Sequence, residues 1–259
     1  MTSKPVFDIQ ITTYSLSIQL SLNGFSFCIA TNDGKIITCF SESKNNDILT
    51  EEELLNKVIE TFNTKPELQA SFQTIEVIYQ NDLFTLVPKE LFDINNKSEY
   101  LNYSVKTLVT DFITHDPITN TNIINIFIPY ININNYLIDQ LGEFNYQHSS
   151  KLLIENVLNN NRNTEKVFVY VSNGIFEVII TKDKELLLFN TFTYKTNEDV
   201  LYYILFCMEQ LSLSPNETEV ILLSLIDEDL YTLIYTYIRN VTKSNEKTDL
   251  ILHKLALKI

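Results

Sequence analysis

The sequence predicts an α/β protein built from two copies of one β-β-β-α-β unit. Two observations predict this fold class. Strand-like segments occur in threes from residue 14 and again from residue 167, and apolar and polar residues alternate over 14–22, as in a strand with one buried face. Each set of three precedes a segment with helical spacing of apolar residues and then a short apolar strand, which indicates an internal duplication.

The first unit opens with a predicted β-hairpin. Apolar and polar residues alternate over 14–22, and residues 25–31 form a second strand-like segment. Between them, Asn23 and Gly24 are expected to supply the two positive-φ positions of a type I′ turn. The remaining elements follow in order: a turn at Asp33-Gly34, a strand over 35–41, a helix over 51–62 that opens with a capping box at Thr50 and Glu53, and a strand over 75–79.

The second unit repeats this order. Asn173 and Gly174 form its predicted hairpin turn. From turn glycine to the aspartate of the next turn is nine residues in both halves, Gly24 to Asp33 and Gly174 to Asp183. The elements predicted around them are strands over 167–172, 175–181 and 185–191, a helix from Thr196 or Asn197 to about residue 213, and a strand over 220–225.

The segment between the two units is predicted to hold further elements. They are a two-residue hairpin turn within Gln80-Asn81-Asp82, strands over 83–87, 105–114 and 123–130, a polar turn at Asp116-Pro117, and helices over 135–141 and 150–159. The polar turn indicates a boundary between two domains, which are predicted to comprise residues 1–118 and 119–259.

The composition excludes several classes of partner. The net charge of -14 over 259 residues argues against nucleic acid and anionic membranes, because phosphate binding needs clustered lysine and arginine. The longest apolar run, 200–208, is too short for a membrane span, which needs about 20 residues. The N-terminal residues lack the pattern of a secretory signal, so a cytoplasmic location is expected.

The cysteines are expected to be small buried hydrophobic residues. Cys28, Cys39 and Cys207 are odd in number, widely spaced and set in apolar or strand-like runs. This pattern favours burial over a disulfide framework or a set of metal ligands.

The duplicated unit, with a tight hairpin at the head of each copy, resembles the actin-like ATPase architecture of sugar kinases, heat-shock seventy chaperones and actin. The amino-acid sequence of residues 110–116, 131–135 and 143–150 is similar to that of an uncharacterised bacterial family. This family is a domain of unknown function with this fold. The resemblance spans nearly the whole chain. It implies two ribonuclease H-like β-β-β-α-β-α domains related by internal duplication.

The resemblance also implies where phosphate would bind. In active relatives, the two hairpins grip phosphate through Asp-x-Gly turns, in which the carboxylate holds Mg²⁺ and glycine lets backbone N–H groups approach the anion. The matching residues here are Asn23 and Gly24 in the first turn and Asn173 and Gly174 in the second. Both acidic positions are missing, so these four residues form degenerate phosphate turns.

A third element of the superfamily is a Gly-Gly pair after a late strand, against which adenosine packs. The matching stretch, residues 222–229, contains no glycine. The chain has only 4 glycines, which also excludes a Walker A loop and a GxGxxG dinucleotide loop.

Other candidate sites have simpler explanations. The acidic run at residues 227–229 is a candidate cation cluster, but carboxylates at the start of a helix are favoured by its dipole. Asp111, His115 and Asp116 are candidates for acid/base chemistry, although a polar turn explains them equally well. The three histidines are far apart, and no serine lies in a Gly-x-Ser-x-Gly elbow.

The sequence therefore favours a non-catalytic protein that binds another protein as an assembly scaffold, as some superfamily relatives do. Two alternatives stay open. One is a divergent phosphotransferase or ATPase that binds ATP and Mg²⁺ through turn amides and carboxylates such as Asp82 or Asp227. The other is a small-metabolite binder that uses the cleft between the domains. A homo-oligomer is compatible with each reading, and no catalytic or metal-binding residue is predicted.

Overall fold

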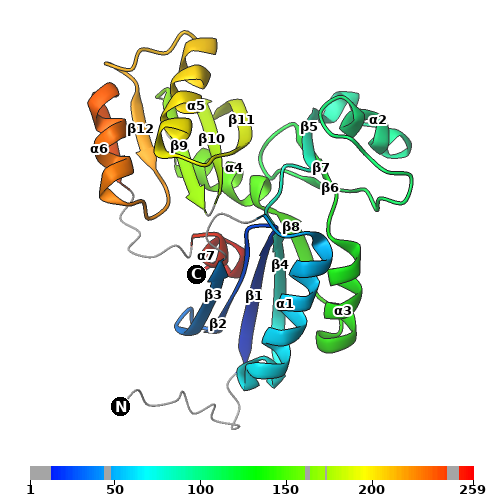
Figure 1. Cartoon of the computed structure of the whole chain (residues 1–259). Coiled ribbons are helices and arrows are strands. Elements are labelled where there is room, and N and C mark those ends of the chain that lie inside the picture. The colour runs from blue at the N-terminus through cyan, green and yellow to red at the C-terminus, as the bar shows by residue number, and fades with distance from the viewer. Residues whose placement is uncertain (1–12, 44–47, 161–163, 173, 244–250) are drawn as a thin grey trace, which may run out of the picture. The chain divides into compact units, whose positions relative to one another are not determined.

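The computed structural model describes residues 13–43, 48–160, 164–172, 174–243 and 251–259. They form two compact units (Figure 1). The first unit comprises residues 1–117, 122–152 and 252–259, and the second comprises 118–121 and 153–251, in each case as far as these are described.

The first unit contains a five-stranded sheet in the order β3-β2-β1-β4-β8. Strands β1, β4 and β8 are parallel, whereas β2 and β3 continue antiparallel from β1 as a meander. The bounds are β1 Tyr14–Ser21, β2 Gly24–Thr31, β3 Ile36–Ser43, β4 Phe72–Tyr79 and β8 Asn145–His148.

The alternation along β1 gives this sheet one apolar face and one polar face. Leu16, Ile18 and Leu20 are fully buried and belong to the first core, together with residues of α1 (Glu51–Thr64) and α3 (Ile131–Leu141). The opposite face carries the serine and glutamine residues of β1, and α7 (Ile251–Leu257) supplies a histidine to it.

The second unit repeats this topology, with a sheet in the order β11-β10-β9-β12-β13. A second core joins this sheet to α5 and α6. The bounds are β9 Lys166–Ser172, β10 Ile175–Lys182, β11 Glu185–Thr193, α5 Asn197–Gln210, β12 Glu219–Leu222, α6 Glu228–Tyr237 and β13 Asn240–Lys243. The duplication predicted from the sequence is confirmed by the matching strand orders.

The two hairpin turns are not equivalent, and the type I′ prediction for the first is wrong. Ser21 pairs with Gly24, so the turn residues are Leu22 and Asn23, and neither Asn23 nor Gly24 has a positive φ. Gly24 instead begins β2. In the second unit Ile175 pairs with Ser172, which makes Gly174 a turn residue with φ of +68°. Asn173 lies outside the described residues.

A separate three-stranded sheet, in the order β5-β7-β6, follows β4. Residues 105–113, predicted as a strand, contain none, and β6 instead occupies the predicted turn at Asp116-Pro117. The predicted hairpin at Gln80-Asn81-Asp82 is also wrong, because β5 pairs with β7 rather than with β4. The bounds are β5 Phe84–Pro88, α2 Lys97–Asn102, β6 Thr114–Pro117 and β7 Ile123–Phe127.

The compact units divide the chain elsewhere than at the predicted boundary of residue 118. Helix α4 (Ser149–Asn160) begins in the first unit, and its residues from 153 belong to the second. Conversely, residues 252–259, which include most of α7 (Ile251–Leu257) and the residues after it, belong to the first unit. Helices α4 and α7 are therefore each divided between the two units, which composition and turn signals did not indicate.

The cysteine prediction is wrong for two of the three residues. Cys28 and Cys39 form a disulfide between the neighbouring strands β2 and β3, where they are direct partners with Cα atoms 4.2 Å apart. Cys28 is buried and Cys39 is exposed. Cys207 is buried and free, as predicted.

Candidate functional site

The carboxyl ends of β1, β4 and β8 meet at one edge of the first sheet, because the three strands are parallel. Ligands of open α/β sheets bind at this kind of edge. Three chain segments lie there: the turn at Leu22-Asn23, residues 80–82 after β4, and the start of α4 after His148. This edge is the candidate functional site.

The first turn is held by bonds within the protein. The backbone N–H of Asn23 donates to the hydroxyl of Ser21 at 3.2 Å, and the carbonyl of Leu22 accepts from the N–H of Leu49 at 2.7 Å. One turn amide that could face a phosphate therefore has a partner already. The carboxylate of an Asp-x-Gly turn is replaced by the neutral amide of Asn23.

Residues after β4 are polar, yet they point into the protein. Gln80 is fully buried, and its Oε1 accepts from Nε2 of Gln19 at 2.8 Å. Its backbone N–H donates to the carbonyl of Leu20 at 2.9 Å. A buried amide with a neighbouring partner holds two strand ends together, and it is poorly placed to orient an attacking water. Asp82, in contrast, is exposed.

Asn81 and His148 form a second buried pair at this edge. The backbone N–H of Ser150 donates to Nδ1 of His148 at 3.2 Å, so the ring proton belongs on Nε2, which lies 3.1 Å from the carbonyl of Asn81. The side-chain Nδ2 of Asn81 donates to the carbonyl of Ile128 at 3.2 Å. Burial lowers the pKa of His148 to about 3, so the ring is neutral at physiological pH.

Two further polar groups lie near this edge. The buried hydroxyl of Tyr130 is close to the side chain of Asn81 and the backbone of Leu22, and hydrogen bonds with both act to lower its pKa. Oε1 of Glu51 has no hydrogen-bond partner among the described residues. Burial raises the pKa of both groups, and the charge of Asp111 raises that of Glu51 further. A hydrogen bond from the backbone of Asn132 lowers the pKa of Glu51 in part. This bond places the Glu51 carboxylate at the first turn of α3.

A histidine that the sequence did not single out occupies the polar face of the first sheet. Nδ1 of His253 lies 2.5 Å from the hydroxyl of Ser17, and Nε2 lies 2.9 Å from that of Ser26. His253 and Ser17 are buried, and burial lowers the pKa of the ring to about 4. Because both ring nitrogens already have serine partners and the ring is inaccessible, this group anchors α7 and is not a hydrolytic dyad.

In the second unit, described polar groups at the matching positions also bond within the chain. Its turn is tied by Tyr194, whose N–H donates to the carbonyl of Gly174 at 3.1 Å and whose hydroxyl donates to the carbonyl of Ser172 at 2.8 Å. After β12, where relatives carry glycine, the hydroxyl of Ser224 accepts from the N–H of Val171 at 2.8 Å. Side chains therefore fill the place of bare backbone.

The remaining candidates make contacts within the chain. Asp227 caps α6, since its carboxylate accepts from the N–H of Leu230 at 2.7 Å. Asp111 accepts from the N–H of Leu108 at 2.7 Å. His115 packs on the ring of Phe92, with 4.8 Å between centroids.

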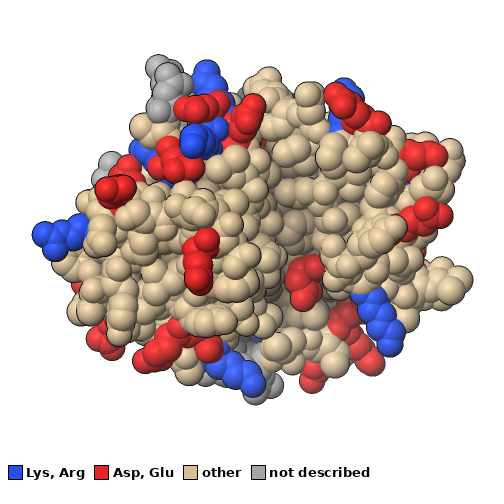
Figure 2. Space-filling model, turned by 90° about the horizontal axis from the view of Figure 1, so that it is seen from above, with Lys and Arg blue, Asp and Glu red and all other residues tan. Residues whose placement is uncertain are grey.

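No metal centre is seen among the residues with described positions. They include no group of three or more His, Cys, Asp or Glu side chains that could hold a metal ion. On the face shown in Figure 2, acidic side chains are spread over a largely uncharged surface. Within the same part of the chain, no helix is long and apolar enough to cross a membrane.

The duplicated mixed sheets and the paired edge turns define a protein with the actin-like ATPase fold. Residues 4–241 match the sequence profile of DUF3822, described as a protein of unknown function. The chain belongs to this family.

Solved structures share the fold. A protein of unknown function with an actin-like ATPase fold from Bacteroides thetaiotaomicron is 22% identical, with a TM-score of 0.82 over 96% of each chain. A chain of the PilM-PilN type IV pilus biogenesis complex is 10% identical, with a TM-score of 0.60 over 94% of this chain and 95% of its own.

The ethanolamine utilization protein EutJ from Carboxydothermus hydrogenoformans is 7% identical, with a TM-score of 0.53 over 98% of this chain and 90% of its own. No curated protein sequence matches the chain.

Proposed function

We propose that this chain is a non-catalytic scaffold that works in the cytoplasm by binding another protein. The observation that carries the proposal is the internal use of the polar groups at the candidate site. Gln80 bonds to Gln19, Asn81 bonds to His148, and the amide of Asn23 bonds to Ser21. Groups that would bind phosphate, Mg²⁺ or an attacking water in an ATPase stabilise the fold here instead.

The missing carboxylates support the same conclusion. A Mg²⁺ ion bound to nucleotide prefers carboxylate ligands, and Asn23 offers a neutral amide. A similar fold occurs in a chain of the PilM-PilN complex, which is an assembly of proteins. The actin-like fold is therefore compatible with a role in protein assembly.

Thermal unfolding with and without millimolar Mg-ATP tests the proposal. A ligand at 100 times its Kd would add about 2.7 kcal/mol of stability, or a shift of several degrees for a chain of this size. We expect no shift. A shift that Gly174→Val abolishes would contradict the scaffold proposal, because a β-branched residue is strained at the positive φ of this turn.

Affinity purification supplies the positive arm of the test. The tagged chain is expected to retain the same protein in equal yield with and without Mg-ATP, identified by mass spectrometry. A partner that is retained only with Mg-ATP would indicate a nucleotide-dependent switch and overturn the proposal.

A further inference from the structure

Helices α1 and α5 hold the same position in the two repeats. Each has 14 residues, follows the third strand of its meander, and opens with a complete capping box, Thr50 with Glu53 and Thr196 with Asp199. The burial patterns also agree. The fully buried residues Leu54 and Val58 of α1 correspond to Val200 and Ile204 of α5, in the same steps from the cap.

The exposed positions of the two helices carry different chemistry. The third exposed position of α1 is Asn56 and the next is Glu60, and both face solvent. The corresponding residues of α5 are Tyr202, which is 60% exposed, and Phe206, which is 42% exposed. Because α1 fills the same place with polar residues, packing of the repeat does not require aromatic residues there.

The two aromatic residues belong to a continuous stripe. Tyr202, Leu205, Phe206 and Glu209 follow one another at helical spacing, so they share one face of α5. The rings of Tyr202 and Phe206 stack with centroids 6.2 Å apart and planes 15° from parallel. We call these four residues the α5 stripe.

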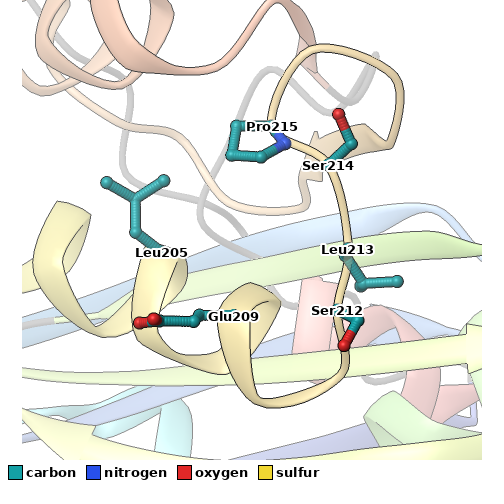
Figure 3. A pocket seen from close by; sticks show the side chains of 6 residues that line it. All are labelled: Leu205, Glu209, Ser212, Leu213, Ser214 and Pro215. Carbon is teal, nitrogen blue, oxygen red and sulfur yellow. The ribbon is translucent and has the colours of Figure 1, made fainter.

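A shallow cavity continues the stripe at the end of α5. It has a volume of about 580 Å³, and its lining residues are Leu205, Glu209, Ser212, Leu213, Ser214 and Pro215. Figure 3 shows the side chains of Leu205 and Pro215 pointing into the same space. The stripe thus leads from two exposed rings into a depression lined by three apolar residues, two serines and the carboxylate-bearing Glu209.

The charged residues within α5 and α6 are all acidic, and the basic residues nearby flank the two helices. Lys195 precedes α5, Arg239 follows α6 with its N–H bonded to the carbonyl of Pro215, and Lys243 pairs with Glu228 at 2.6 Å. Neither α5 nor α6, which packs against it, contains a lysine or arginine. The acidic residues of the two helices are Glu198, Asp199, Glu209, Glu228 and Asp229. Helix α6 adds the exposed rings of Tyr235 and Tyr237.

We propose that the α5 stripe docks an amphipathic helix of a partner protein, with apolar residues that pack on Tyr202, Leu205 and Phe206 and lysine or arginine residues that meet the acidic side chains of α5. The apolar residues of the stripe supply contact area, and the acidic residues of the helix favour a basic partner. A second copy of this chain fits less well, since it would bring identical acidic faces together. The inference rests on the proposed protein-binding function and names its surface.

Fluorescence anisotropy with designed peptides tests the inference on the full chain. The probe is a labelled amphipathic peptide of about 18 residues, five helical turns, with a leucine ridge and lysine on its polar face. Two controls carry the same ridge with glutamate, or the same lysine and leucine residues in scrambled order. We expect binding of the lysine-ridge peptide alone, weakened by added salt.

The double variant Tyr202→Asn and Phe206→Glu copies α1 onto α5 and should weaken binding at least about tenfold. Its fold is tested by circular dichroism, and both sites are exposed. The matched control, Asn56→Ala with Glu60→Ala, alters the same positions of α1 and should leave binding unchanged.

Three results would overturn the inference: no binding of the lysine-ridge peptide, equal binding by the double variant, or equal binding of the glutamate peptide. A wild-type dimer that the double variant abolishes, seen by light scattering, would also overturn it and assign the stripe to self-association. The peptide-binding experiment does not depend on Mg-ATP, whereas the scaffold proposal is tested by the melting temperature with Mg-ATP. Failure of the docking surface can therefore be told apart from failure of the scaffold proposal.

Discussion

His253 and Ser17 are 236 positions apart in sequence, yet Nδ1 of the histidine lies 2.5 Å from the serine hydroxyl. The chain completes the second unit before α7 returns to the sheet where it began. Ser17 lies on the polar face of that sheet, where a buried hydroxyl needs a partner. The histidine supplies it and bonds to Ser26 as well.

Replacement of this histidine should destabilise the first unit. His253→Ala leaves the hydroxyl of Ser17 buried without its partner and creates a cavity under α7. We expect the free energy of unfolding in urea to fall by about 2 to 4 kcal/mol. Ser26→Ala, which removes one of the two bonds, should cost about 1 kcal/mol. A loss below about 0.5 kcal/mol for His253→Ala would contradict an anchoring role.

Acid should weaken the fold through two buried histidines. The pKa of His253 is lowered to about 4 and that of His148 to about 3, from 6.5, so the unfolded chain binds protons more readily. Their stabilising contribution is complete above about pH 6.5 and is lost as the pH falls. At pH 5 each should cost about 2 kcal/mol.

Urea unfolding at pH 7.5 and pH 5 measures this effect. His253→Gln should show about half of the histidine-dependent loss between these values, because only His148 remains. An unchanged pH slope in the variant would show that His253 is not protonated on unfolding.

The disulfide should make stability depend on reductant. Cys28 and Cys39 close a loop with a sequence separation of 11, for which chain entropy predicts up to about 3 kcal/mol. Dithiothreitol should lower the urea midpoint of the wild type and leave Cys39→Ser unaffected. The exposure of Cys39 gives the reductant access.

Thiol titration of the denatured, unreduced protein should then find one thiol, that of Cys207. Disulfides are uncommon in cytosolic proteins. Titration after rapid alkylation in cells therefore also tests the expected cytoplasmic location, and three alkylated thiols would mean that the bond is absent there.

The acidic run at the start of α6 should act as a cap. Asp227→Ala removes the bond to the N–H of Leu230 and should cost about 1 kcal/mol, whereas Asp227→Asn keeps an effective cap and should cost little. Millimolar Mg²⁺ or Ca²⁺ should not change the melting temperature of either form. A rise in melting temperature with Mg²⁺ or Ca²⁺ that Asp227→Asn removes would indicate a metal site and contradict this prediction.

Local pattern predicted much of the fold. The alternation along Tyr14–Ser21 and the capping boxes at Thr50 and Thr196 gave the correct type of element, because side-chain periodicity and cap chemistry act over a few residues. The disulfide between the two cysteines could also have been predicted from the sequence. Cys28 and Cys39 are equally distant from the turn at Asp33-Gly34, and a hairpin centred there makes them direct partners.

Other features depend on contacts that no local pattern encodes. Asn23-Gly24 was predicted to form the turn, but pairing of Ser21 with Gly24 shifted the turn by one residue, because the ladder between β1 and β2 decides the register. The candidate site differs from its prediction for the same reason. Gln80 looked like a turn residue, and only the approach of Gln19 from another strand shows it as a buried structural amide.

The sequence alone determined the α/β class, the duplication, and the loss of the carboxylates and glycines that a nucleotide site uses. These properties follow from residue identity and short-range periodicity. The tertiary structure decided that His253 anchors α7 on the first sheet, and that Tyr202 and Phe206 face solvent where the equivalent helix is polar. Burial and long-range pairing depend on how distant segments meet, and that is set by the assembled fold.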